Sequence, residues 1–230
     1  MFFINRLNVS YGESKVITDL NLELQKGEIL AVMGRNGMGK TTLFKSLIGI
    51  LDCGSSSSIK INETELASEP SYMRVRNGLA YVPQGRMIFP NLSVTDNIRT
   101  GLDSSNEKNV PDYVYELFPV LKEMGKRKGG NLSGGQQQQL AIARALVTKP
   151  KVLLLDEPTE GIQPSIIKEM AEKLKTIRDM HDVSIIVAEQ VLSFALTACD
   201  RFLVMEGGAI VHSSDRSEVD AEKIKKFLSV

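Results

Sequence analysis

The sequence predicts an α/β fold, in which helices cover a largely parallel β-sheet. The first observation is a set of short apolar runs, which are typical of strands buried on both faces of a sheet: Ile29–Val32, Leu79–Val82, Val152–Leu155, Val183–Val187 and Phe202–Met205. The second is a glycine-rich turn, Gly34–Gly39, that joins the first run to a helix expected at Thr41–Ile50.

The N-terminal segment differs, because its apolar residues alternate along the chain. Phe3, Asn5, Leu7 and Val9 are expected to share one face of a strand, and Leu20–Leu24 has a leucine at every second position. This pattern predicts strands joined by a turn. A long helix is predicted at Pro164–Met180, where proline suits the first turn and apolar residues recur at helical spacing.

The block between residues 88 and 148 contains helical pieces near Val94–Gly101, Asp112–Leu121 and Gln136–Val147, with no convincing buried strand among them. We therefore expect one domain spanning residues 1–230. Its catalytic core is predicted at 1–87 and 149–230, and an inserted α-helical subdomain at about 88–148.

The charge balance, the apolar runs and the cysteines of the sequence exclude several classes of protein. Across 230 residues, 28 Lys and Arg balance 28 Asp and Glu, which argues against a protein that coats nucleic acid or an anionic lipid surface. No apolar run approaches the length of a membrane-spanning helix, and the N-terminus lacks the pattern of a secretory signal. Cys53 and Cys199 stand alone and predict reduced thiols, so a cytoplasmic chain is expected.

A phosphate-binding loop is the strongest motif. It reads Gly34-Arg35-Asn36-Gly37-Met38-Gly39-Lys40-Thr41, followed by Thr42. Glycines let backbone N–H groups surround phosphate oxygens, and the next helix directs its positive end at the same anion. Lys40 is placed to reach the β- and γ-phosphates of a nucleotide, and the Thr41 hydroxyl to join the shell of Mg²⁺.

Two acids after a buried strand supply the second half of a nucleotide site. The run Val152–Leu155 ends in Asp156 and Glu157, which places both at the carboxyl edge of the sheet, where the phosphate loop also emerges. We expect Asp156 to hold Mg²⁺ and Glu157 to polarise the water that attacks the γ-phosphate.

A second anion-binding turn is predicted where Leu132-Ser133-Gly134-Gly135-Gln136 opens a helix. One nucleotide cannot engage both turns of a single chain if they belong to different subdomains. A head-to-tail pair of chains solves this, with ATP between the phosphate loop of one and this turn of the other. The alternative is a plain helix N-cap within a glycine-rich linker.

With these motifs in order, the chain resembles the ATP-binding subunit of an ABC transporter over nearly its full length. The resemblance implies a P-loop NTPase (RecA-like) core with an N-terminal antiparallel β subdomain and an inserted α-helical subdomain, and ATP and Mg²⁺ as cofactors. It also implies that Tyr11 stacks on adenine. Gln84 would contact Mg²⁺ or water and sense the membrane partner.

Two positions depart from the family pattern. Gln190 stands where the family usually has a histidine at the γ-phosphate, and the D-loop, Glu160–Gln163, lacks its usual aspartate. An amide can hydrogen-bond a phosphate but cannot become a cation. Gln190 and the sequence Tyr81–Pro90 resemble the branch that takes up branched-chain amino acids and urea. Three segments resemble the urea-type subunit: Gly34–Lys40, Gln136–Gln139 and Glu160–Ser165. We therefore expect urea as the solute, with branched-chain amino acids or a related amide as the alternative.

The resemblance further implies partners. These are a second, related ATPase in the head-to-tail pair, two membrane permeases at the inner face of the cell membrane, and a periplasmic solute-binding protein; no nucleic acid is expected. Gln84–Leu92 would receive a short permease helix, with Phe89 either exposed there or buried in the helical subdomain. Two other interpretations are a soluble ABC ATPase without a transport role and a regulatory subunit that does not hydrolyse ATP.

Overall fold

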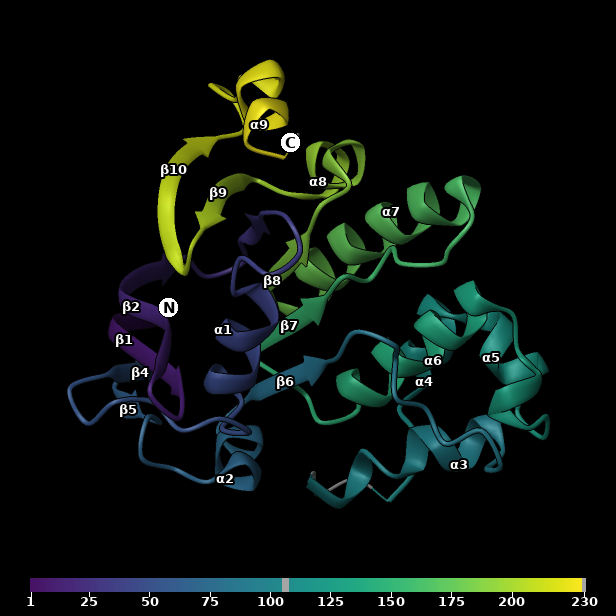
Figure 1. The fold of residues 1–230 in the computed structure, drawn as a ribbon. Helices are drawn as coiled ribbons and strands as arrows, with labels where there is room; N and C mark the ends of the chain where they lie inside the picture. The colour runs from purple at the N-terminus through teal and green to yellow at the C-terminus, as the bar shows by residue number, and fades with distance from the viewer. Residues whose placement is uncertain (105–107, 229–230) are drawn as a thin grey trace.

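The computed structural model describes residues 1–104 and 108–228. Within them the chain forms two β-sheets, and helices pack between and beside the sheets (Figure 1). No helix of the described residues is long and apolar enough to cross a membrane. Both cysteines are free thiols.

The larger sheet has the strand order β10-β9-β3-β8-β7-β6. Its strands are β3 (Ile29–Met33), β6 (Leu79–Val82), β7 (Val152–Asp156), β8 (Ser184–Glu189), β9 (Arg201–Glu206) and β10 (Ala209–Asp215). The first five pair in parallel, whereas β10 adds an antiparallel edge. All five predicted buried strands are therefore confirmed, and β10 was not predicted.

Alternate residues of the parallel strands pack into two hydrophobic cores, one on each face of the larger sheet. In β3, Ile29, Ala31 and Met33 face the core that the later helices cover, while Leu30 and Val32 face the core shared with the smaller sheet. A strand with no polar face is what burial on both sides of a parallel sheet requires.

The smaller sheet is antiparallel and has the order β2-β1-β4-β5. Its strands are β1 (Phe2–Tyr11), β2 (Ser14–Leu24), β4 (Ser58–Ile61) and β5 (Thr64–Glu65). The N-terminal strand pair is confirmed, but its predicted face is wrong in part: Phe2 and Ile4 are buried rather than Asn5. The register shifts between Ile4 and Leu7, where Arg6 adopts a φ of 48°, so the inward face changes parity.

Five helices belong with the sheets. They are α1 (Lys40–Leu47), α2 (Ser71–Arg76), α7 (Pro164–His181), α8 (Leu192–Ala198) and α9 (Ala221–Leu228). Helix α1 lies between the two sheets, and its Leu43, Phe44 and Leu47 join the core formed with the smaller sheet (Figure 1). Helices α7 and α8 cover the other face of the larger sheet. The predicted helices at Thr41–Ile50 and Pro164–Met180 are present with shifted ends.

The remaining helices gather beside the larger sheet, beyond the end of β6 (Figure 1). They are α3 (Val94–Arg99), α4 (Asp112–Leu117), α5 (Pro119–Glu123) and α6 (Gly134–Leu146), with short 3₁₀ turns at Leu102–Ser104 and Gly129–Asn131. The predicted helical piece Asp112–Leu121 is broken at Phe118, because Pro119 disfavours a helical residue before it. The subdomain boundaries at 88 and 148 stay a prediction.

Candidate functional site

The phosphate loop lies between β3 and α1, and two of its glycines are sterically required. Gly39 caps α1 with a φ of 102°, a conformation that other residues rarely adopt. At Gly34, a Cβ would lie 2.6 Å from the carbonyl oxygen of Met205 in β9. The backbone can therefore form this tight loop at the head of α1 only with glycine at these positions.

Lys40, the first residue of α1, is buried at the centre of the loop. Its Nζ donates to the carbonyl oxygens of Gly34 at 2.7 Å and Arg35 at 3.1 Å. It also forms an ion pair with Oε1 of Glu157 at 3.2 Å. The ammonium group is thus fixed inside the phosphate loop, a position from which a lysine binds a polyphosphate.

Asp156 ends β7 beside the first turn of α1. Its Oδ1 accepts a hydrogen bond from the Thr41 hydroxyl at 3.2 Å, and its Oδ2 accepts one from Tyr81 OH at 3.1 Å. Burial raises the pKa of the Asp156 carboxyl above its ordinary value, although both hydrogen bonds oppose the shift. Burial, and the nearby Asp156, also raise the pKa of Tyr81, which keeps that phenol protonated as a donor.

The Thr41–Asp156 pair is a suitable donor set for Mg²⁺. Both side chains offer hard oxygen atoms, which Mg²⁺ prefers, and they face each other at the start of the phosphate loop helix. Few protein ligands are needed because this ion keeps waters and takes phosphate oxygens as its other ligands. Thr41 and Asp156 would be the residues that hold it.

Glu157 follows Asp156 and turns sharply out of the strand. Its φ is 48°, and its N–H donates to the Ala188 carbonyl at 2.9 Å, which holds this conformation. Its Oε2 accepts from Gln190 Nε2 at 3.1 Å and from Gln84 Nε2 at 3.4 Å. The structure therefore brings Glu157 and Gln190, both predicted at the γ-phosphate, into one cluster with Lys40 and with Gln84, which was predicted to contact Mg²⁺ or water.

A cavity of about 300 Å³ opens over this cluster. It is lined by Val16, Arg35, Asn36, Gly37, Gly39, Lys40, Thr41, Thr42, Gln84 and Glu157. Gln190 reaches its rim, since Gln190 Nε2 also donates to Asn36 Oδ1 at 2.9 Å. Tyr11 is 49 % exposed at the end of β1 and does not line the cavity.

Sequence reasoning missed Glu189, the acid that ends β8. This carboxylate is buried and accepts four hydrogen bonds: Oε1 from the backbone and hydroxyl of Thr159, and Oε2 from the backbone N–H groups of Gln190 and Val191. It thus ties the segment after Glu157 to Gln190. The available signal was an acid at the end of an otherwise apolar strand, the same pattern that identified Asp156.

The second predicted turn, Ser133–Gln136, lies away from the phosphate loop and lines no part of its cavity. Ser133 and Gln136 form a capping box at the start of α6: Ser133 Oγ accepts from the Gln136 N–H at 3.4 Å and Gln136 Oε1 accepts from the Ser133 N–H at 3.0 Å. Ser133 is exposed. A Cβ on Gly134 or Gly135 would crowd Gly161 or Ile166, so the turn packs against the D-loop and the start of α7.

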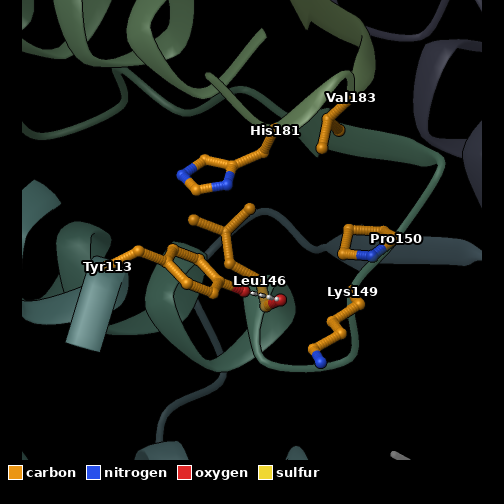
Figure 2. Close-up of a pocket in the computed structure, with 6 residues that line it drawn as sticks. All are labelled: Tyr113, Leu146, Lys149, Pro150, His181 and Val183. Carbon is orange, nitrogen blue, oxygen red and sulfur yellow. Dashed lines mark hydrogen bonds between the residues drawn. The ribbon is translucent and has the colours of Figure 1, made fainter. Parts of the chain in front are cut away.

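Another cavity, of about 240 Å³, lies between α4, the end of α6 and the end of α7 (Figure 2). Tyr113 and His181 face each other there with ring centroids 4.3 Å apart, and Tyr113 OH donates to the Leu146 carbonyl at 2.9 Å. None of its lining residues was predicted to bind nucleotide. Residues predicted at the phosphate loop line a different cavity.

Comparison with known proteins agrees with this geometry. A family model described as "ABC transporter" matches residues 17–160. A high-affinity branched-chain amino acid transport ATP-binding protein, BraG of Pseudomonas aeruginosa, is 40 % identical over 214 residues, which are 92 % of this chain and 91 % of that protein. A probable branched-chain amino acid transport ATP-binding protein, LivF of Archaeoglobus fulgidus, is 35 % identical, covering 96 % of this chain and 95 % of that protein.

Solved structures show the same fold. A nucleotide-free ATP-binding cassette from an ABC transporter matches with a TM-score of 0.84 at 22 % identity, covering 100 % of this chain and 95 % of that one. The cbiO1 protein of Clostridium perfringens, described as part of the ABC transporter complex cbiONQ, matches with a TM-score of 0.82 at 28 % identity, covering 97 % and 92 %. The predicted fold class is confirmed. The preference for urea gains no support, because both of these relatives are named for branched-chain amino acids.

Proposed function

Because this chain belongs to the ABC transporter family and is one of its ATP-hydrolysing cassettes, we propose that it powers an importer of branched-chain amino acids. In this proposal it pairs head-to-tail with a related ATPase, and the pair drives two membrane permeases fed by a solute-binding protein. The observation that carries the proposal is the cluster of Lys40, Asp156 and Glu157 over the phosphate loop, in a chain 40 % identical to such a subunit.

The site residues have distinct roles in the proposed hydrolysis. The loop amides and Lys40 bind the phosphates and stabilise the charge that develops on them. Thr41 and Asp156 hold Mg²⁺, which supplies charge neutralisation when bound. Glu157 accepts the proton of the attacking water as general base.

Gln190 and Gln84 support that base. Both amides donate to Oε2 of Glu157, and Gln190 bridges it to Asn36 in the phosphate loop. We assign Gln190 the contact with the γ-phosphate and Gln84 a contact with Mg²⁺ or water. We assign Tyr11, which is exposed at the end of β1, to stack on adenine.

The turn Ser133–Gln136 serves the ATP of the partner subunit in this scheme. Its position outside this chain's own phosphate cavity, with Ser133 exposed, supports a role across a subunit interface. Two backbone-rich anion sites, one from each chain, would then enclose each nucleotide.

A groove of about 510 Å³ between β6, α3 and α6 is the proposed seat of the permease. Met87 and Phe89 line it and are 69 % and 47 % exposed, and the guanidinium carbon of Arg144 lies 5.4 Å from the Phe89 ring centroid. Exposed apolar side chains around a groove are typical of a surface that receives a partner helix.

Replacing Lys40 tests the site. Lys40→Ala should weaken ATP binding by about tenfold to hundredfold, because a charge-assisted hydrogen bond contributes about 1.5–3 kcal/mol. Titration calorimetry with ATP measures the affinity, and Lys60→Ala, on the exposed side of β4, is the matched control. Unchanged affinity in Lys40→Ala would overturn the assignment.

Replacing Glu157 tests the chemistry. Glu157→Gln keeps the shape and one acceptor oxygen but removes the base, so kcat for ATP hydrolysis should fall by about 10²–10⁴ while ATP remains bound. Glu206→Gln, an exposed acid at the end of β9, is the control. Hydrolysis at the parental rate by the Glu157 variant is incompatible with the proposed role.

The solute is tested in cells. Deleting the gene should abolish growth on low concentrations of branched-chain amino acids as sole nitrogen source and spare growth on urea. The reverse phenotype would replace this solute with urea, and growth on both would reject the importer.

A further inference from the structure

The three residues after Gln84 form an unusual backbone. Gly85, Arg86 and Met87 have φ values of 75°, 67° and 44°, so all three are left-handed. Only glycine adopts this conformation without strain, and a non-glycine residue there persists where its surroundings hold it.

The Arg86 side chain reaches two other segments from this turn. Its Nη2 donates to the carbonyl oxygen of Glu160 in the D-loop at 2.8 Å, and its Nη1 donates to Gln137 Oε1 in α6 at 3.5 Å. In return, Nη2 of Arg144 in α6 donates to the Arg86 carbonyl at 3.2 Å. Arg86 thus connects the turn, the D-loop and helix α6, whose N-cap is Ser133.

Arg144 also links Arg86 to the groove that Phe89 lines. Arg144 lies under the ring of Phe89, which is exposed, while its other contact is the Arg86 carbonyl. Burial lowers the pKa of Arg144, consistent with a guanidinium held inside this packing. Pressure on Phe89 would therefore move Arg144 and, through it, the backbone of Arg86.

The inward end of this connection is the catalytic acid. Thr159 is fixed by the buried Glu189, and the carbonyl of the next residue, Glu160, accepts from Arg86. The Glu160 N–H donates to the Glu157 carbonyl at 3.1 Å. A displacement of Arg86 would therefore move Glu160 and, through this hydrogen bond, the backbone of Glu157.

We propose that Arg86 is a positioning residue that couples the groove at Phe89 to the D-loop and to Glu157. It holds Glu160 in place, and a partner seated on Phe89 changes that hold through Arg144. The proposal rests on the proposed function for the occupant of the groove and for the role of Glu157, whereas every contact it uses lies within this chain.

Hydrogen exchange, measured by mass spectrometry on the isolated full chain, tests whether Arg86 stabilises the D-loop through the Glu160 carbonyl. Arg86→Ala should speed exchange of the Glu160 and Ile162 amides about tenfold, because the D-loop loses its charge-assisted anchor. Arg86→Lys, which can still donate to the Glu160 carbonyl, should restore most of the protection. Arg99→Ala, an exposed arginine of α3, is the matched control and should change nothing.

A double-mutant cycle tests the coupling. Arg144→Met should also speed exchange in the D-loop, but it should add nothing in the Arg86→Ala background if Arg86 carries the connection. The proposal is overturned if Arg86→Ala leaves D-loop exchange unchanged, if Arg86→Lys rescues nothing, or if the effect of Arg144→Met persists without Arg86. These readouts need neither transport nor hydrolysis, so their failure is distinct from a failure of the growth and ATPase tests.

Discussion

Glu189→Gln is the most informative substitution for the architecture of the site. The parental carboxylate is 1 % exposed, and its four acceptor contacts are 3.1 Å and 2.5 Å from Thr159 and 2.8 Å and 3.0 Å from Gln190 and Val191. An amide has one acceptor oxygen, so one pair of donors must face its NH₂ group.

The favoured orientation can be derived from the donors. The Thr159 hydroxyl can rotate and accept from the NH₂ group, whereas two backbone N–H groups on the other side cannot. The amide oxygen therefore stays with Gln190 and Val191, and the Thr159 N–H is left without its partner. An unsatisfied buried donor costs about 1–3 kcal/mol, and the retained bonds weaken because the acceptor is neutral. We expect a loss of about 2–3 kcal/mol in unfolding free energy.

Urea unfolding followed by circular dichroism measures this loss, and Glu206→Gln serves as control for the charge change. ATPase assays should also show a lower kcat with little change in KM, because Gln190 moves relative to Glu157 while the phosphate loop keeps its contacts. Glu189→Gln with parental stability and parental kcat would refute the view that this carboxylate fixes the site.

Two further substitutions separate stability from function. Asp156→Asn should abolish Mg²⁺-dependent hydrolysis yet raise unfolding free energy at pH 8 by about 1 kcal/mol, because it removes a buried charge. The folded pKa of Asp156 is raised, so the penalty for its buried charge is present above that pKa and is lost as pH falls through it. The difference in unfolding free energy between the two proteins should therefore shrink in urea titrations as the pH is lowered, and a constant or growing difference contradicts this. Arg74→Met should lower unfolding free energy by about 3–5 kcal/mol, because this buried guanidinium donates to the carbonyls of Ser46, Leu47, Ala67 and Glu69, and an unchanged urea midpoint would contradict it.

The parts of the site that follow one strand were predictable. Each phosphate-loop residue lies within a few positions of β3 and α1, and Asp156 and Glu157 directly follow β7. Parallel strands end at one edge of a sheet, so the two motifs had to meet there. Gln190 was singled out through the family resemblance, which expects a residue at the γ-phosphate after the next buried strand.

Contacts between distant loops could not be predicted in the same way. Thr159 meets Glu189 across 30 residues and Arg86 meets Glu160 across 74, and neither pair has a local pattern. The face of β1 was mispredicted for a local reason, since the bulge at Arg6 leaves no apolar signal. The transported solute was the hardest feature to predict from the sequence, because the residues of the described site were assigned to the nucleotide and none to the solute.

The contacts of Glu157 suggest an order of events in the proposed reaction. Oε1 faces Lys40 Nζ at 3.2 Å, while Oε2 is held by Gln190 and Gln84. An oxygen whose lone pair accepts from an ammonium group cannot use that lone pair for water. Lys40 occupies one of the two lone pairs of Oε1, and that lone pair becomes free for water when Lys40 turns toward phosphate, which carries more negative charge than one carboxylate. Phosphate binding and the freeing of this lone pair are then linked. Gln190, unlike a histidine, contacts Glu157 without changing its own charge.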